Sequence, residues 1–445
     1  MVGVSATVVL VAFDSTIVTT TLPRVAQALN GMALYAWVGT GYLLATAASI
    51  LVFGRLGDLF GRKPLMLISV SIVGIGSILC GVAQNMPQLI VFRVLQGIGG
   101  GMMIATAFAA PADLFPVTRD RVKWMAMISA TFAVASGIGP VLGGAVTQAL
   151  GWRAAFFVAP VAAAAALFLL GRYFPNMVSL HSGARKIDWL GAFLLVVGVA
   201  APLAALELAF APGEHSHPWW GLMLGAAGLL SWLLLIPLER RVPAPIFPLR
   251  ILASRQSQLL NVAAVATGAI MFTLIFYGPL LLQHELLYTP SQAGLLMTPL
   301  VVGIPVGSIV NGRLFARQSE PQRLMVFGSF LLTVGSAAML TVTADSAAWW
   351  ILLVFLINGV GLGFVLPNLT LFMQILADRA DVGVASALVQ TTRAVGSAAG
   401  TAAVGIAISH ASVLTGIRAG LAMCVLLGVL CAVISSRIKM KNAMA

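Results

Sequence analysis

Charged residues are scarce in this chain. Asp, Glu, Lys and Arg make up 9% of its 445 residues, hydrophobic residues make up 60%, and the mean hydropathy is +1.01. A soluble globular domain has about 25% charged residues, so a chain this apolar could not keep its surface in water. The scarcity of charge therefore excludes a soluble fold and indicates a protein that lies within a membrane.

Acidic residues are rarer than basic ones: the chain has 13 Asp and Glu and 25 Lys and Arg, which gives a net charge of +12. The positive residues cluster in short segments between apolar runs, as they do in cytoplasmic loops of membrane proteins. We therefore expect the bilayer, and not nucleic acid, as the partner of this charge. The three cysteines lie in apolar runs and predict neither a disulfide nor a metal site.

Phosphate-binding loops are also lacking. No GxxxxGK[ST] string occurs, and no polar segment is long enough to form a nucleotidase domain. The chain is therefore expected to be no enzyme and to need no cofactor. Any work that it does would draw on an ion gradient, such as the proton gradient, or on the gradient of its substrate.

Long apolar runs dominate what is present. Each has the roughly 20 residues that cross a bilayer core, and an even number places both ends of the chain on one side. Placing those ends in the cytoplasm leaves all but five of the 25 Lys and Arg residues in cytoplasmic segments. The pattern predicts an all-α integral membrane protein with 14 transmembrane helices at residues 2–22, 33–53, 64–84, 86–112, 124–150, 154–172, 189–210, 218–238, 257–283, 286–312, 324–344, 346–376, 382–409 and 419–436.

An internal repeat divides these runs. The string Gly54-Arg55-Leu56 recurs at 312–314, Asp120-Arg121 recurs at 378–379, and Gly139 and Gly143 match Gly396 and Gly400 at nearly the same offset. Parallel repeats of this kind occur in transporters, where the substrate site lies between the two halves. We predict two pseudo-symmetric six-helix bundles, at residues 1–175 and 256–445, with two inserted helices between them at 176–255.

One run is unusually rich in glycine. Residues 136–144 read Ser-Gly-Ile-Gly-Pro-Val-Leu-Gly-Gly, inside a charge-free apolar segment. Pro140 removes a helical hydrogen bond and is expected to bend the helix. Gly139 and Gly143 are four residues apart, so they present a smooth face that another helix can approach closely, and Gly137 and Gly144 extend the string. By itself this is a helix-packing motif.

The loop at 54–63 combines glycines with charges of both signs. It reads Gly-Arg-Leu-Gly-Asp-Leu-Phe-Gly-Arg-Lys, and its glycines permit a tight turn. Asp58 and Arg62 can make charge-assisted hydrogen bonds at the membrane surface. A merely positive loop would need neither the aspartate nor the glycine spacing.

Two ionisable residues lie deep within the first and fourth runs. A carboxylate at Asp14 is costly unless it faces water, finds a partner or is protonated, which suits reversible proton binding. At 1.5 Å per residue, Asp14 lies about 12 Å and Arg93 about 10 Å from the same face, so their depths match. The alternatives are an Asp14 bonded to local hydroxyls such as Ser15 and an Arg93 bonded to backbone carbonyls.

Other polar residues within the apolar runs are weaker candidates. Arg393 is near the middle of its span and either contacts substrate or joins the halves. Gln96 follows Arg93 by three residues, and Glu207 ends an inserted span near the outer face. The pair His215 and His217 is too little for a metal site.

These strings together resemble the signatures of the major facilitator superfamily. The loop at 54–63 is similar to its motif A, residues 93–97 to motif B and residues 136–144 to motif C, which is associated with proton-coupled antiporters. Residues 13–23 resemble motif D of the 14-span drug:proton antiporters, and residues 288–294 are also family-like. The resemblance covers essentially the whole chain.

Several roles follow from the resemblance alone. It implies that Asp58 caps a helix of the opposite half, that Arg62 pairs with Asp113, and that the three form a gating latch. It implies proton coupling by Asp14 and Arg93, and a seal between the halves at residues 137–144. The second copy of motif A has Ala316 and Glu320 where those partners would be, so only the first copy is expected to form the latch.

The function that this reading predicts is export of amphipathic or cationic compounds in exchange for protons, by alternating access. The predicted location is a bacterial inner membrane, with both termini in the cytoplasm. We expect the chain to work as a monomer, and a periplasmic adaptor of a tripartite pump is a candidate partner. Two alternatives stay open, namely a narrow exporter of one metabolite, siderophore or antibiotic, and a non-transporting receptor or lipid scramblase on the same fold.

Overall fold

The structure is a computed structural model that describes residues 1–31, 34–115, 117–176, 188–210, 218–242, 249–288, 290–315, 317–378, 381–410 and 412–439. The regular secondary structure of these described residues is helical. They are α1 (Val2–Ala28), α2 (Tyr35–Phe60), α3 (Arg62–Val82), α4 (Met86–Leu114), α5 (Thr118–Leu150), α6 (Trp152–Phe156), α7 (Val158–Tyr173), α8 (Trp189–Phe210), α9 (Pro218–Glu239), η3 (Leu249–Leu252), α10 (Arg255–Leu280), η4 (Leu281–Glu285), α11 (Pro290–Phe315), α12 (Gln322–Met339), α13 (Ala348–Leu376), α14 (Val382–His410) and α15 (Val413–Arg437).

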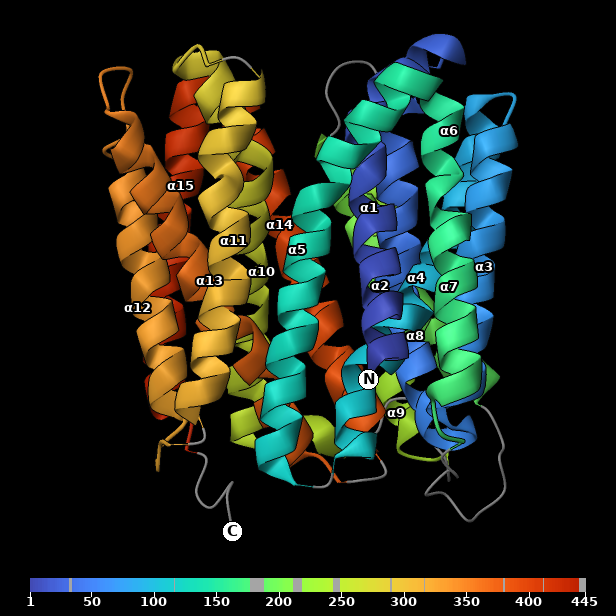
Figure 1. Ribbon diagram of the computed structural model, residues 1–445. Coiled ribbons are helices and arrows are strands. Elements are labelled where there is room, and N and C mark those ends of the chain that lie inside the picture. The colour runs from blue at the N-terminus through green and yellow to red at the C-terminus, as the bar shows by residue number, and fades with distance from the viewer. Residues whose placement is uncertain are drawn as a thin grey trace.

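The long helices stand side by side in two groups (Figure 1). In the first group α2 and α3 pack on α4, and α1 packs on α5 and α7; in the second, α10 packs on α14 and α15, and α11 and α12 pack on α13. The groups meet where α5 contacts α11 and where α14 contacts α2 and α4. The pair α8 and α9 belongs to neither group, and α8 packs against α2 of the first group and α14 of the second. These contacts give the arrangement of two bundles and one extra pair.

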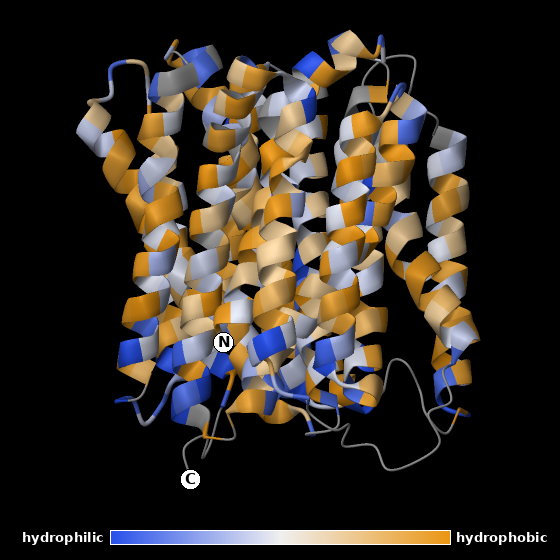
Figure 2. Ribbon diagram, turned by 45° about the vertical axis from the view of Figure 1, so that its right-hand side comes forward, coloured by the Kyte–Doolittle hydropathy of each residue, from blue (hydrophilic) through white to orange (hydrophobic). Residues whose placement is uncertain are grey.

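The predicted fold class is confirmed. Among the described residues, eleven helices are long and apolar enough to cross a membrane, and α1 and α8 contain shorter apolar segments. Hydrophobic residues extend along the helices, while hydrophilic residues gather at the helix ends, most of them at the end where the C-terminus lies (Figure 2). In a bilayer each backbone N–H and C=O must be bonded within its own segment, so apolar runs of this length form helices.

The helix ends differ from the predicted spans in places. The helix α5 begins at Thr118, six residues before the apolar run that starts at 124, and carries the polar residues Asp120 and Lys123. The span predicted at 286–312 is shifted, because α11 runs from Pro290 to Phe315 and a π-helical turn precedes it at Leu281–Glu285. Helical hydrogen bonding continues beyond the apolar core, whereas hydropathy marks only the core itself.

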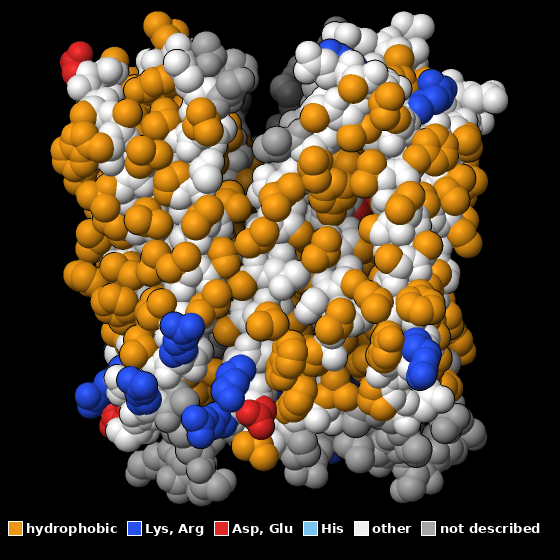
Figure 3. All heavy atoms as spheres, viewed as in Figure 1, with side chains coloured by type: hydrophobic (Ala, Val, Ile, Leu, Met, Phe, Trp, Pro, Cys, Tyr) orange, Lys and Arg blue, Asp and Glu red, His pale blue; other side chains and the backbone are white. Residues whose placement is uncertain are grey.

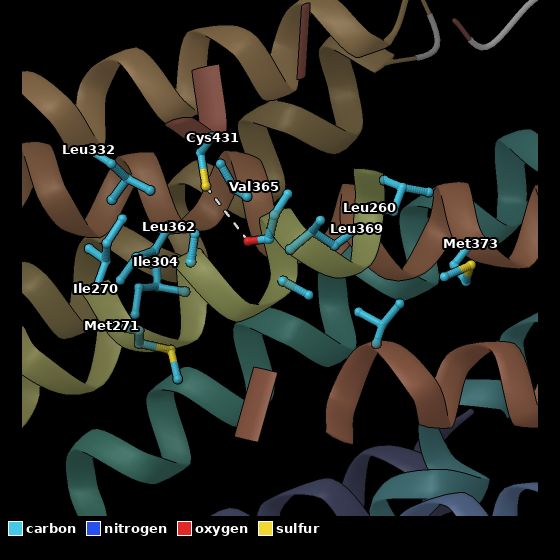
Figure 4. Close-up of a cluster of buried hydrophobic side chains, with 14 of the residues drawn as sticks. Leu260, Ile270, Met271, Ile304, Leu332, Leu362, Val365, Leu369, Met373 and Cys431 are labelled. Atoms are coloured by element: carbon cyan, nitrogen blue, oxygen red, sulfur yellow. Dashed lines mark hydrogen bonds between the residues drawn. The ribbon is translucent and has the colours of Figure 1, made fainter. Parts of the chain in front are cut away.

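The core of the second group is closely packed. In Figure 4, Ile270 of α10 lies near Ile304, Leu332 and Leu362 of the neighbouring helices, whereas Leu260 of the same helix lies near Leu369 of α13. All of these are almost fully buried apart from Ile304, which is 6% exposed. Cys431 joins this core as a small thiol whose Sγ lies 3.7 Å from the carbonyl oxygen of Ala263. The same buried cluster continues into α2 through Ile50 and Leu51, so the core is shared across the contact between the two groups.

The two groups are joined at one end and separate at the other. We call the joined end, where α2 meets α3 and α5 begins, the basic end, since most of the Lys and Arg side chains on the face in Figure 3 gather there. The same view shows a notch between the groups at the opposite end, and the outer part of α5 leans away from α11 (Figure 1). The structure is therefore closed at the basic end and open at the other.

Candidate functional site

The turn between α2 and α3 brings a set of charges to the basic end. Gly61 links the helices with φ +88°, a conformation that glycine adopts without a steric penalty. A Cβ at Gly57 would collide with the Arg62 guanidinium, which folds back over α2 and donates to the carbonyl oxygen of Gly54 at 3.3 Å. The prediction of a loop over 54–63 is thus corrected, because α2 continues to Phe60 and Gly61 alone links the helices, and the path of the Arg62 side chain accounts for the glycine at 57.

Arg62 and Asp58 join four helices. Arg62 Nε donates to Asp113 Oδ2 at the end of α4 at 2.7 Å, and its guanidinium also bonds Asp58. Asp58 in turn accepts hydrogen bonds from the backbone N–H groups of Gly383 (3.0 Å) and Val384 (3.2 Å), at the first turn of α14. The first N–H groups of a helix have no partner within it, so a carboxylate placed there caps the helix. The carboxylate of Asp58 thereby connects the first helix group to the second.

A second ionic contact between the groups lies beside this one, and no sequence pattern predicted it. Asp381, whose side chain is 1% exposed, accepts hydrogen bonds from Arg55 Nη1 at 3.0 Å and from Arg250 Nε at 2.7 Å. Arg250 belongs to η3, so the connection that follows the extra helix pair also takes part. In the sequence, Asp381 is visible only as an acid directly before the apolar run at 382–409. Its separation from Arg55 and Arg250 along the chain follows no pattern that would predict a contact.

The acid of α1 lies within the first group. Asp14, Arg93 and Gln96 are each no more than 1% exposed. Arg93 Nη1 is 3.5 Å from Asp14 Oδ2 and donates to Gln96 Oε1 at 2.7 Å, while Gln96 Nε2 donates to Asp14 Oδ1. Within the described residues, Asp14 Oδ2 receives no hydrogen bond. The three side chains form a compact polar cluster in which Asp14 Oδ2 lies beside the Arg93 guanidinium.

Tyr42 of α2 completes the cluster. The Cζ atom of Arg93 lies 4.1 Å from the centroid of the Tyr42 ring, which is a cation–π distance. The sequence named Gln96 as a possible substrate or interface residue, and its place three residues after Arg93 puts both on the same face of α4. Its position between Asp14 and Arg93, and the contact with Tyr42, were not predicted. Tyr42 had no sequence signal, because its neighbourhood depends on how α2 packs on α4.

The glycine string of α5 faces two different helices. A Cβ at Gly137 would collide with Val301 of α11, in the second group, and one at Gly139 would collide with Thr16 of α1, two residues from Asp14. An added Cβ at Gly144 would meet nothing within 4 Å. Gly143 is buried, and the side chain of Pro140 lies outside what the structure describes. The string therefore approaches both the other half and the helix that carries the acid.

The remaining candidates lie elsewhere. Arg393 is half-buried on α14, where its backbone and Cγ approach Gly268 of α10, and no described carboxylate lies within salt-bridge distance of it. The side chain of Glu207 and the segment with His215 and His217 lie outside the described residues. The structure thus does not bring Arg393 together with Asp14 and Arg93.

Comparison with known proteins agrees with this architecture. Residues 4–401 match the profile described as Major Facilitator Superfamily. The chain is 31% identical over 367 residues to "Multidrug resistance protein 3" of Bacillus subtilis, covering 82% of this chain and 70% of that protein. It is also 31% identical over 410 residues to "Multidrug transporter protein MdtP" of the same species, covering 90% and 73%.

Two solved structures have a similar fold. The human organic anion transporter MFSD10 (TETRAN) is 17% identical with a TM-score of 0.69, and the alignment covers 97% of this chain and 98% of that one. The proton:xylose symporter XylE is 13% identical with a TM-score of 0.73, and the alignment covers 99% and 95%. The sequence matches and the two-bundle architecture together show that this chain belongs to the major facilitator superfamily and is a multi-pass membrane transporter.

Proposed function

We propose that the protein is a proton-coupled antiporter of the 14-span type that exports amphipathic or cationic compounds. Its relatives named as multidrug transporters support the export of drug-like molecules. The extra pair α8 and α9 between the two groups supports the 14-span assignment. The observation that carries the proton coupling is Asp14, a buried carboxylate beside Arg93 with one oxygen that receives no hydrogen bond from the described residues.

We place the basic end in the cytoplasm of a bacterial cell and the protein in its inner membrane. The short loops of membrane proteins that carry most Lys and Arg face the cytoplasm. With this orientation the closed basic end and the open opposite end correspond to an outward-open state. Asp58, Arg62 and Asp113 then act as a latch that holds the cytoplasmic side shut.

Protonation of Asp14 would change the balance of charge in its cluster. The ionised carboxylate attracts Arg93 directly and holds it through Gln96. Once Asp14 is neutral, the ion pair is lost and Arg93 retains Gln96 and the ring of Tyr42. Tyr42 is on α2, the helix that carries Asp58 of the latch near its end. The position of α2 can therefore respond both to the charge of the Asp14 cluster and to the state of the latch.

The test is proton release from the detergent-solubilised protein when a lipophilic cation such as tetraphenylphosphonium is added. We expect the wild-type protein to release protons and Asp14→Asn to release none, because the titrating group is gone while the shape is nearly unchanged. The matched control is Glu285→Gln, which removes an acid of the second group at the end opposite the basic end. This variant should release protons normally. Equal release from wild type and Asp14→Asn would move the coupling to another acid, with Glu207 next to be tested.

A further inference from the structure

A groove runs along the outer surface of the first group and reaches across to the second. It has a volume of about 1510 Å³ and is formed by α1, α5, α7 and α11. We call it the α5–α11 groove. Its floor lies where these two helices touch, since a Cβ at Gly312 would be 3.1 Å from the Cβ of Ala126, and both residues line the groove.

Above the floor the groove is apolar and open to the membrane. Ile138 and Leu142 of α5 are 47% and 44% exposed, and Ile309 of α11 is 45% exposed. Drug-sized ligands occupy pockets of roughly 300–1,000 Å³, so this groove is larger than one such molecule needs. In a bilayer its exposed apolar walls require an apolar occupant of matching length.

The basic end of the same groove is strongly positive. Four exposed basic side chains line this end of the groove. Two belong to α5, namely Arg119 and Lys123; Arg313 belongs to α11, and Arg317 lies in the turn after α11. Lys123 is 3.4 Å from Asp120, and none of the three arginines lies within salt-bridge distance of a described carboxylate. Figure 3 shows Lys and Arg side chains gathered at the lower ends of α5 and α11.

We propose that the α5–α11 groove binds an anionic phospholipid of the leaflet at the basic end. The headgroup phosphate contacts the four basic side chains, and the acyl chains lie along the apolar walls of α5 and α11. A cavity that is positive at a membrane surface and apolar within the membrane matches the chemistry of such a lipid. Basic pockets between transmembrane helices on the cytoplasmic side recognise anionic headgroups in this way.

The bound lipid would also stabilise the closed basic end. Two of the cations belong to each helix group, and like charges that converge on one groove repel each other. A phosphate between them offsets that repulsion only while the ends of α5 and α11 stay together. The lipid therefore acts as a regulator of conformation, a role that does not depend on the identity of the transported compound.

The test compares phosphatidylglycerol with phosphatidylcholine of the same acyl chains, by native mass spectrometry of the lipid that the solubilised protein retains. We expect a preference for phosphatidylglycerol in the wild type. Because each surface Lys or Arg strengthens anionic lipid binding by roughly fivefold, Arg119→Gln/Lys123→Gln and Arg313→Gln/Arg317→Gln should each weaken this preference by roughly tenfold or more.

Two controls separate charge from folding. Arg437→Gln removes a charge at the exposed end of α15, outside the groove, and should keep the full preference. Arg313→Lys/Arg317→Lys keeps both charges and should also keep it. A wild type without any preference, or two double variants that retain it, would overturn the proposal. Displacement of phosphatidylglycerol by tetraphenylphosphonium would instead make the groove a substrate site and would equally overturn it.

A second readout reports on the conformation. Spin labels on cysteines at Arg172 and Glu320, one in each group near the basic end, should give a larger short-distance fraction in phosphatidylglycerol than in phosphatidylcholine. Arg313→Gln/Arg317→Gln should remove this difference. The same distance distribution in both lipids would show that the lipid does not hold the basic end closed.

Discussion

The carboxylate of Asp58 near the end of α2 accepts a hydrogen bond from the backbone N–H of Gly383 at 3.0 Å, although 325 residues separate them. The contact joins the two helix groups at the basic end. A Cβ at Gly383 would collide with Asp58 itself, so the glycine is what allows the approach.

Asp58→Asn should therefore favour the state in which the basic end is open. The loss of a helix cap costs about 1 kcal/mol, and Arg62 also loses one of its two carboxylates. We expect substrate binding to persist and turnover to fall at least fivefold, measured by binding to the solubilised protein and by transport in vesicles. Glu320→Gln, an exposed acid paired with Arg323, is the control. Wild-type turnover in Asp58→Asn at normal expression would refute the latch.

Asp381→Asn should destabilise the protein more than the same change at the neighbouring acid Asp378. The change leaves the buried Arg55 without the carboxylate at 3.0 Å, and breaking a buried pair in this way costs about 3–5 kcal/mol. Asp378→Asn is a matched control, because the Asp378 side chain is 74% exposed and its contact with Arg250 is long, at 3.8 Å. Thermal unfolding in detergent should show a clear drop in midpoint for the first variant alone. Equal midpoints would mean that the contact contributes nothing.

Gly137→Ala should push α5 away from α11. The added methyl group would collide with Val301, and overpacking of this kind costs about 1–3 kcal/mol. We expect lower coupled transport with normal membrane insertion, and recovery in the double variant Gly137→Ala/Val301→Ala, which restores the space. Gly144→Ala, with open space around its Cβ, should transport normally. Failure of the double variant to recover would argue against steric contact between these helices.

Tyr42 should act through its ring and not through its hydroxyl group. A desolvated cation–π contact is worth about 2 kcal/mol, and Tyr42→Phe keeps the ring beneath Arg93 whereas Tyr42→Leu removes it. We expect transport close to wild type for Tyr42→Phe and a loss of roughly tenfold for Tyr42→Leu. Matched losses in both variants would assign the role to the hydroxyl group instead.

Membrane orientation can be read from the two ends of α12. Glu320 precedes this helix and Asp345 follows it, and both are exposed, whereas the described native cysteines are buried. In intact cells a membrane-impermeant maleimide should label Asp345→Cys at once and Glu320→Cys only after permeabilisation. The reverse order of labelling would invert the proposed topology.

The sequence alone predicted the helices and much of the polar machinery. Apolar runs of about 20 residues predict spans because the bilayer leaves backbone groups no other partner. Asp14 and Arg93 could be paired because depth follows from the rise per residue. The glycines of residues 54–63 predicted a tight turn, which the structure has at Gly61, although residues 54–60 are helical. These are local properties, encoded by neighbours along the chain.

Only the tertiary structure decided which helices meet. It placed Gln96 between Asp14 and Arg93, turned Gly137 and Gly139 toward different helices, and brought Asp381 to Arg55. All helices here are apolar on most sides, so hydropathy does not identify their neighbours. Close approach of small residues and a few buried polar contacts select the partners, and these depend on residues that are hundreds of positions apart.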